Sequence, residues 1–331
     1  MDQALIIDRL REAGLVNGGE VVLRPLTGGV SSDIMVVETS SWRFVVKRAL
    51  PKLRVRQDWF ADPSRNRFEH AYLRYVGEFL PSAVPQVLHA DDRAGYFAME
   101  YLGEGFETWK SRLMAGRCHE ATAVICALQL AAIHTRSWEN PEVRGRFETT
   151  DFFRELRMEP YLLSMASAHP ALASLLEAEV ERIVSNRLCL VHGDYSPKNL
   201  LIGPDRLVIV DSEVAWFGDP AFDVCFLLNH LMLKALRLPE HRAALFGLAR
   251  AFWKTYRSAM IPHLGQIEPH LPRLLAMLML ARVDGKSPVE YLNEAHLQET
   301  VRRFTHRCLR EALPASPEDF FQSWNQALSS P

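Results

Sequence analysis

His192-Gly193-Asp194-Tyr195-Ser196-Pro197-Lys198-Asn199 is the stretch that decides the fold of this chain. An apolar run at residues 188–191 (LCLV) precedes it, and a second run at residues 207–210 (LVIV) follows and ends at Asp211. Short apolar runs bounded by turn residues are typical of buried strands. The pattern predicts a β-hairpin that brings two carboxylates and a carboxamide close together in the sequence.

Oxygen-bearing side chains at this spacing suit transfer of a phosphoryl group, which requires charge neutralisation and alignment more than covalent chemistry. Mg²⁺ prefers oxygen ligands, and we expect Asp211 and the side-chain oxygen of Asn199 to supply them. Asp194 is the candidate base for an acceptor hydroxyl. We expect His192 to tie the loop together by hydrogen bonds and Lys198 to reach a phosphate. A β-hairpin with an ordinary polar loop is the alternative.

The motif also carries a family resemblance. His192-Gly193-Asp194 with Asn199, followed by Asp211-Ser212-Glu213, resembles the aminoglycoside phosphotransferase and choline kinase superfamily. Protein kinases have His-Arg-Asp and Asp-Phe-Gly at these places, so Gly193 and Ser212-Glu213 favour the small-molecule branch. Asp-x-Glu is similar to methylthioribose kinases, in which the Glu also serves the metal. The resemblance implies that Glu213 is a second carboxylate ligand; a solvated turn residue is the alternative.

A glycine-rich turn lies between two predicted strands near the N-terminus, at residues 21–23 and 34–38. Glycine lets backbone N–H groups approach phosphates. Gly-Gly-x-Ser at this position resembles the phosphate loop of the superfamily, although a plain hairpin turn is the commoner meaning. The resemblance implies four nucleotide-binding residues: Gly28, Gly29, Ser31 and Ser32.

Lys47 ends a predicted strand at residues 42–47, where kinases carry their phosphate-binding lysine. Strand alternation places Val45 and Lys47 on one face and Phe44 and Val46 on the other. A helix is predicted to begin at Asp62-Pro63, with the aromatic residues from Phe68 to Phe79 forming its buried face. By analogy with the kinase Lys–Glu ion pair, we expect Glu69 on that helix to pair with Lys47, with Glu78 as the alternative.

Residues 96–103 (YFAMEYLG) form a predicted buried strand that enters a loop. In the superfamily this segment is the hinge between two lobes, and the resemblance places Glu100 and Leu102 beside the adenine. Backbone recognition leaves no side-chain signature, so ATP is the expected donor and GTP stays open.

The order of elements predicts an α+β, protein-kinase-like two-lobe fold. An antiparallel β-sheet lobe that binds nucleotide is expected at residues 1–103, and a mainly helical catalytic and acceptor-binding lobe at residues 104–331. Asp219 is expected to cap a helix that begins at Pro220, and Asp223 to brace the catalytic loop from that helix. The helices of the second lobe are predicted at residues 121–134, 171–183, 221–236, 242–256 and 271–283.

Composition excludes several classes of protein. The 331 residues carry a formal net charge of −2, which favours neither nucleic acid nor an anionic membrane as a partner. A local basic run consists of Arg48, Lys52, Arg54 and Arg56, with Arg65 and Arg67 beyond. We expect a solvated loop after the Lys47 strand, and contact with an anionic substrate or donor phosphate is the alternative. Five scattered cysteines without a C-x-x-C pair indicate neither a zinc site nor a disulfide framework. Together with the absence of a signal peptide or a bilayer-length apolar run, they favour the cytoplasm.

The acceptor is the least determined part of the prediction. Arg282 is a candidate substrate residue because methylthioribose kinases have paired arginines in a similar setting, and residues 147–157 are a second candidate segment; a helix end or surface loop is the alternative for both. Acidic residues are not clustered after residue 240, which disfavours polycationic aminoglycosides. A hydroxylated small molecule is therefore expected. The rivals are a silent pseudokinase or scaffold, an aminoglycoside-resistance kinase and a protein kinase. The sequence does not indicate an oligomeric state.

Overall fold

The computed structural model describes residues 3–26, 31–52, 54 and 61–329. The chain forms two compact units. The first unit consists of Met1–Phe106 and Gly203–Glu213, and the second of Glu107–Ile202 and Val214–Pro331. The predicted strand that ends at Asp211 thus belongs with the N-terminal unit. Within that unit, the amide of Ile209 donates to the carbonyl of Ala83 at 2.7 Å, which holds the inserted segment in place.

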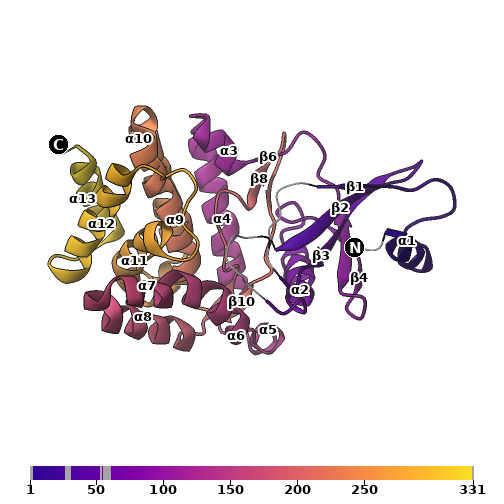
Figure 1. Ribbon diagram of the computed structural model, residues 1–331, viewed down its shortest axis with the longest axis horizontal. Coiled ribbons are helices and arrows are strands. Elements are labelled where there is room, and N and C mark those ends of the chain that lie inside the picture. The colour runs from indigo at the N-terminus through magenta and orange to yellow at the C-terminus, as the bar shows by residue number, and fades with distance from the viewer. Residues whose placement is uncertain (1–2, 27–30, 53, 55–60, 330–331) are drawn as a thin grey trace. The chain divides into compact units, whose positions relative to one another are not determined.

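A five-stranded antiparallel sheet forms the centre of the first unit, in the order β1-β2-β3-β5-β4 (Figure 1). Its strands are β1 (Val22–Pro25), β2 (Ser32–Glu38), β3 (Arg43–Ala49), β4 (Val87–Asp91) and β5 (Tyr96–Glu100). The unit also contains two helices and one further strand: α1 (Gln3–Glu12), α2 (Arg65–Gly77) and β9 (Leu207–Ile209).

The two faces of β3 differ as the alternation predicts. Phe44 and Val46 lie in a hydrophobic core with Ile6 and Leu10 of α1. Lys47 points to the other face, where it meets α2. β3 is flanked by β2 and β5, so both of its edges are paired, and the lysine is fixed on a strand with little freedom to move.

Helix α2 differs from the prediction in two respects. It begins at Arg65 rather than at Asp62-Pro63, because residues 62–64 form a turn in which the Asp62 carboxylate accepts a hydrogen bond from the amide of Ser64 at 2.8 Å. The predicted aromatic face is correct only in part. Tyr72 is buried, whereas Phe68 and Tyr75 are only half-buried. Polar residues occupy much of the buried face, and a hydrophobic pattern does not detect them.

The second unit is mainly helical. Its longer helices are α4 (Glu120–Ser137), α8 (Ala173–Ser185), α9 (Pro220–Arg237), α10 (Arg242–Ala259), α11 (Leu271–Asp284), α12 (Ala295–Arg310) and α13 (Pro317–Ser329). Its shorter elements are β6 (Glu107–Thr108), α3 (Trp109–Met114), α5 (Pro141–Arg146), α6 (Thr150–Phe153), the π-helix η1 (Arg154–Leu163), α7 (Ser164–Ala168), β7 (Cys189–Val191), β8 (Leu200–Ile202) and β10 (Trp216–Gly218). β6 pairs with β8, and β7 with β10, both antiparallel.

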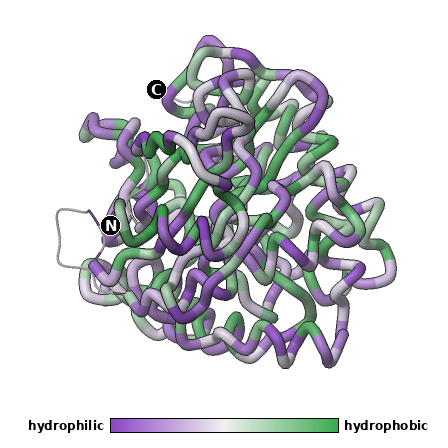
Figure 2. The backbone as a smooth tube through the Cα atoms, turned by 90° about the vertical axis from the view of Figure 1, so that its right-hand side faces the viewer, coloured by the Kyte–Doolittle hydropathy of each residue, from purple (hydrophilic) through white to green (hydrophobic). Residues whose placement is uncertain are grey.

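Helix α9 is the centre of this unit. It is buried along nearly its whole length and packs against α10 and α11 (Figure 1). Hydrophobic and hydrophilic stretches alternate along the chain (Figure 2), as expected for elements with one face toward a core. Cys189 and Cys225 are buried in this unit.

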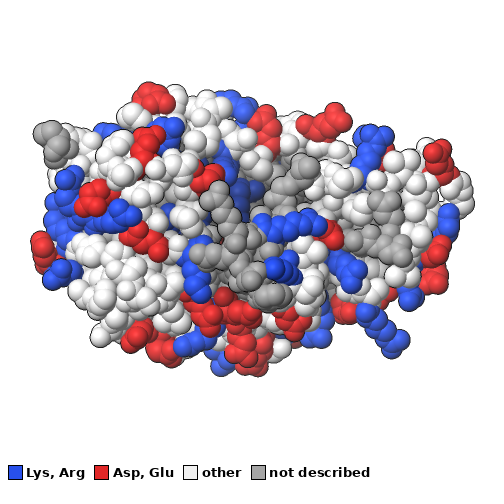
Figure 3. Space-filling model, viewed as in Figure 1, with Lys and Arg blue, Asp and Glu red and all other residues white. Residues whose placement is uncertain are grey.

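The architecture confirms the predicted α+β, kinase-like class: an antiparallel sheet unit and a helical unit. The five predicted helices correspond to α4, α8, α9, α10 and α11. On the face that Figure 3 shows, basic and acidic side chains are interspersed, in keeping with the near-neutral net charge. Among the helices that the structure describes, none has both the length and the hydrophobicity of a transmembrane span.

Candidate active site

The predicted catalytic loop lies in the second unit, between β7 and β8, and it is buried. Asp223 of α9 binds the loop by its backbone. One carboxylate oxygen accepts from the amide of His192 at 2.7 Å, and the other accepts from the amide of Gly193 at 2.9 Å. The predicted bracing role of Asp223 is confirmed. Asp219 caps the same helix, as predicted, by accepting from the amide of Ala221 at 2.9 Å.

Gly193 is required by the shape of the loop. Its φ is +76°, in the region that favours glycine. A Cβ atom at this position would lie 2.7 Å from the carbonyl oxygen of Val214. The backbone therefore has no space for a side chain. This explains physically why glycine stands where protein kinases have arginine.

Two cations hold the carboxylate of Asp194. Nη2 of Arg157 and Nζ of Lys198 each lie 3.0 Å from Oδ2 of Asp194. The amide of Asp194 donates to Nδ1 of His192 at 3.1 Å, which is the kind of loop contact predicted for that histidine. Nδ2 of Asn199 donates to the carbonyl of Asp194 at 3.0 Å, so the amide oxygen is the Asn199 atom available to a cation.

Arg157 is a site residue that the sequence did not identify. It lies on η1, and its Nε donates to the carbonyl of Gly193 at 2.6 Å while Nη2 meets Asp194. It falls in the charged and aromatic segment 147–157, a candidate acceptor segment for which a helix end or surface loop is the alternative. The side chain is instead 9% exposed. Charge density within that segment was the only local signal, because nothing in its spacing relates it to Asp194.

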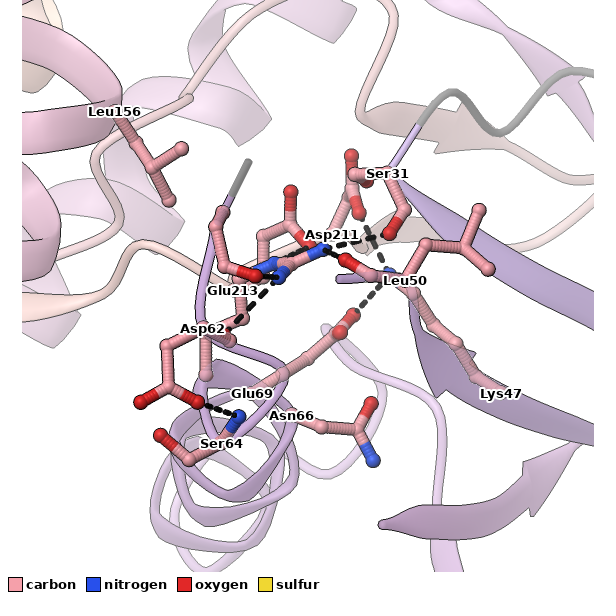
Figure 4. Close-up of polar contacts among 12 residues, drawn as sticks. Ser31, Lys47, Leu50, Asp62, Ser64, Asn66, Glu69, Leu156, Asp211 and Glu213 are labelled. Atoms are coloured by element: carbon pink, nitrogen blue, oxygen red, sulfur yellow. Dashed lines mark hydrogen bonds and ion pairs between the residues drawn. The ribbon is translucent and has the colours of Figure 1, made fainter. Parts of the chain in front are cut away.

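In the first unit, Lys47 joins two carboxylates (Figure 4). Its Nζ lies 2.7 Å from Oε1 of Glu69 and 2.6 Å from Oδ1 of Asp211. The expected Lys47–Glu69 ion pair is therefore present, and Glu78 at the end of the helix is exposed. Burial opposes the positive charge on Lys47, but Asp211, Glu69 and Glu213 outweigh it and raise its pKa above the ordinary value. Burial raises the pKa of Glu69 to about 7, against the opposing effect of Lys47.

Asp211 has a left-handed backbone, with φ of +65°. A non-glycine residue in this region costs of order 1 kcal/mol and is found most often where function fixes the backbone. The strain directs the carboxylate of Asp211 toward Lys47 immediately after β9. Its side chain is 29% exposed, in contrast to the fully buried Glu69.

The prediction of solvated basic residues is wrong for Arg65, whereas Arg48 and Arg67 are exposed as expected. Arg65 is completely buried, and its Nε donates to Oε2 of Glu213 at 3.0 Å. It also donates to the carbonyls of Ser31, Leu50, Ala61 and Asp62. Glu213 is 9% exposed and is thus not a solvated turn residue. An arginine that binds five acceptors fixes the ends of three segments at once.

The remaining nucleotide-binding candidates differ in how far the structure describes them and in their burial. Gly28 and Gly29 lie outside the described residues. Ser31 and Ser32 are buried at the start of β2. The Glu100 side chain forms an ion pair with Arg206 and accepts from the amide of Gln86, so it is engaged within the first unit. Leu102 is half-buried. Any adenine contact at these two positions stays a prediction and would be made by the backbone.

Arg282 lies near the end of α11, not on a surface loop. Its Nη1 donates to the hydroxyl of Tyr161 at 3.0 Å and to both oxygen atoms of Ser287. Tyr161 is on η1, one turn after Arg157. The candidate acceptor residue and the cation that holds Asp194 are therefore neighbours through one aromatic ring.

Comparison with known proteins supports the assignment of the fold. Residues 22–256 match the model of the Phosphotransferase enzyme family (APH). The chain belongs to this family. A curated methylthioribose kinase from Erwinia tasmaniensis is 28% identical over 60% of this chain and 56% of its own length. The chain thus spans little more than half of that relative.

Solved structures show the same fold at low sequence identity. The amicoumacin kinase hAmiN in complex with AMP-PNP, Ca²⁺ and Ami is 16% identical, with a TM-score of 0.58 and 97% of each chain covered. Choline kinase LicA from Streptococcus pneumoniae is also 16% identical, with a TM-score of 0.53 and 99% of each chain covered. At this identity the likeness establishes the fold alone, and the family match supports the small-molecule phosphotransferase class.

Proposed function

We propose that this protein transfers the γ-phosphoryl group of ATP to a hydroxyl group of a small molecule, with Mg²⁺ and with Asp194 as the base. The observation that carries the proposal is the state of Asp194: a buried carboxylate of the family motif, held by two cations on one oxygen. A carboxylate in this environment can orient a hydroxyl and accept its proton as the bond to phosphorus forms. The two cations fix the direction of the carboxylate.

The residues present suit a magnesium nucleotide. Asp211 and Asn199 offer hard oxygen donors, and Mg²⁺ commonly takes one or two protein oxygens together with phosphates and water. No group of three His, Cys, Asp or Glu side chains converges within the described parts of the chain, which is compatible with that mode of binding. The metal ion would neutralise charge on the phosphates. Glu213 is a less direct candidate because Arg65 already occupies one of its oxygens.

The nucleotide-binding part is proposed to be the N-terminal region, residues 1–103, with the catalytic and acceptor-binding part after it. Lys47 would bind a donor phosphate, and Glu69 would hold the lysine in position, as their ion pair indicates. Lys198 would then serve two groups, Asp194 and a phosphate oxygen. GTP is the alternative donor, because backbone contacts to the base would not reveal which purine is bound.

Asp194→Asn tests the proposal. The replacement preserves shape and removes the base, so transfer should fall at least about 100-fold while binding of Mg²⁺–ATP persists. Asp211→Asn should weaken the metal-dependent part of nucleotide binding as well. The matched control is Asp205→Asn, which changes an exposed aspartate in the same hairpin. Full activity in Asp194→Asn toward an identified acceptor would show that another group is the base.

A binding-only role is the second candidate function. Assays of the wild type and of Asp194→Asn distinguish this role from catalysis. A scaffold would show no Asp194-dependent nucleotide turnover with any acceptor. Absence of a melting-temperature shift with Mg²⁺–ATP would further favour that role. Lys47, Asp194, Asn199 and Asp211 are all retained, and three of them are buried with the partners described above, so we favour the active enzyme.

A further inference from the structure

A buried lysine at the centre of the second unit has a tyrosine hydroxyl as its hydrogen-bond partner among the described residues. Lys234 is on α9 and is 1% exposed. Its Nζ lies 3.4 Å from the hydroxyl of Tyr291 and 4.4 Å from the centre of that ring. His230, one turn earlier on α9, lies 3.3 Å from the same hydroxyl through Nδ1. Among the described residues, no carboxylate hydrogen-bonds to Lys234.

Arg282, a second cation close to Lys234, also has neutral hydrogen-bond partners. We call Lys234, His230, Tyr291 and Arg282 the cation cluster. Arg282 donates to Tyr161 and Ser287, while its Nε is buried and lacks a hydrogen-bond partner within the described residues. The Tyr161 ring lies 5.4 Å from the guanidinium carbon of Arg282 and 5.9 Å from that of Arg157. Because Arg157 binds Asp194, the cluster is connected to the catalytic carboxylate through a single tyrosine.

Two further lysines contribute positive charge near His230. Lys110 and Lys198 lie close enough to His230 to lower its pKa, together with Lys234 and Arg282, although burial is the larger cause. Lys110 is tied to the catalytic loop, since its amide donates to the carbonyl of Pro197 at 2.8 Å. Lys110 thus links the cluster to the loop that carries Asp194 and Lys198.

Carboxylates are fewer than cations in this neighbourhood. Glu290 forms an ion pair with Lys110, and Asp194 is held by Arg157 and Lys198. Asp284, two residues after Arg282 on α11, forms ion pairs with Arg302 and His169. It therefore does not neutralise the charge of Arg282. The described part of the cluster therefore has a surplus of positive charge at Lys234 and Arg282.

A surplus of buried positive charge is costly to maintain. Burial, together with Lys110 and Arg282 and against the opposing effect of Glu290, lowers the pKa of Lys234 to about 7. A buried cation without a counter-ion destabilises a fold, and such arrangements are found preferentially where a ligand supplies the missing charge. An oxyanion placed here would bind Lys234 and Arg282 and would leave its hydroxyl-bearing part on the side of Asp194.

We propose that the acceptor is a small hydroxylated molecule carrying an oxyanion, either a carboxylate or a phosphate ester, and that Lys234 and Arg282 bind this group. The inference rests on the proposed phosphotransferase function and narrows its substrate class. Tyr291 and His230 then complete the polar lining around the anion. The same surplus of cations disfavours aminoglycosides and choline-like acceptors, whose positive charge it would repel.

Matched acceptors test the charge preference directly. One panel pairs each neutral polyol with its aldonic acid and its phosphate monoester, and adds choline as a cation, all with the same Mg²⁺–ATP assay. We expect phosphorylation of the anionic members at a much higher kcat/KM than of the neutral ones. A carboxylate preference and a phosphate preference are distinguished by the two anionic arms.

Variants then test the two residues. Lys234→Met should raise KM for the anionic acceptor by roughly 10–100-fold, as for loss of a charge-assisted hydrogen bond, with a smaller effect on any neutral acceptor. Arg282→Gln should act in the same direction. The matched controls are Lys254→Met and Arg273→Gln, since both of these residues are exposed and Arg273 is on the same helix as Arg282.

The outcomes separate this inference from the proposed function. Asp194-dependent transfer that is best with neutral or cationic acceptors, and is unchanged in Lys234→Met, would overturn the anion site while the phosphotransferase assignment stands. If no compound is phosphorylated, calorimetry with the same carboxylates and phosphates decides. Binding that is weakened in Lys234→Met but not in Lys254→Met supports the anion site, and equal or absent binding refutes it.

Discussion

Nη2 of Arg157 lies 3.0 Å from Oδ2 of Asp194, and Nε of the same arginine lies 2.6 Å from the carbonyl oxygen of Gly193. One guanidinium thus fixes both the side chain and the preceding backbone of the candidate base. The fork of Arg157 reaches both acceptors at once, which a lysine ammonium on a flexible stem cannot reproduce.

Arg157→Lys should therefore lower kcat roughly 10–100-fold with a small change in KM for ATP, because the base loses its fixed direction but keeps a nearby positive charge. Steady-state kinetics against an identified acceptor measure the effect. Arg154→Lys is the matched control, since that arginine begins the same π-helix and pairs with Glu181 in an exposed position. Equal loss of activity in both variants would contradict a positioning role for Arg157.

Gly193→Ala should destabilise the fold by about 2–4 kcal/mol, combining an unfavourable φ with a clash against the carbonyl of Val214. Chemical denaturation measures the change. Gly95→Ala supplies the control, because Gly95 also has a positive φ of +70° but has open space around its missing Cβ. If both substitutions cost the same, backbone strain alone accounts for the glycine and the steric argument fails.

Arg65→Lys should lower the free energy of unfolding by about 2–4 kcal/mol, because an ammonium cannot satisfy the acceptors that the guanidinium bridges. Glu213 would then lose its partner, so we also expect a change in the Mg²⁺ dependence of nucleotide binding. Thermal and urea unfolding, with and without Mg²⁺–ATP, provide the readout. Arg67→Lys, at an exposed position two residues later, should change neither quantity.

Lys234→Met should stabilise the ligand-free protein at pH 6 by about 2–4 kcal/mol. Methionine has a similar length to lysine, and the substitution removes a buried charge that the neighbouring groups do not fully neutralise. The folded-state pKa of about 7 lies below that of the unfolded chain. The unfolded state therefore binds more protons, and wild-type stability should rise with pH from about 7 toward the unfolded lysine pKa, near 10.4.

The measurement is a pH series of urea unfolding for the wild type and Lys234→Met, with Lys254→Met as the control. The difference between the wild type and Lys234→Met should shrink as pH rises. Groups that face Lys234 are Tyr291, His230, Lys110, Glu290 and Arg282, and all of these remain in the variant. A difference that is independent of pH would show that the lysine does not titrate in this range.

The sequence predicted the elements whose signals are local. Alternation placed Lys47 and Phe44 on opposite faces of β3, and the Pro220 and Asp219 pair marked the start of α9. Helix periodicity located α4 and α10 because their apolar stripes are long. It misjudged α2, where the buried face combines apolar residues with the polar residues Arg65, Asn66, Glu69 and His70.

What the sequence alone determined is the order of the chemistry-bearing groups: Lys47, Glu69, Asp194, Asn199 and Asp211, whose types and spacing specify a phosphoryl-transfer plan. What only the tertiary structure decided is the set of cations around them. Arg65, Arg157 and Lys234 are remote from the motif along the chain, and charged residues are ordinarily exposed, so their sequence context indicates solvent. Burial against specific oxygen acceptors or aromatic rings reverses that expectation, because a cation leaves water only where the fold has already placed its partners, or where a ligand will supply one.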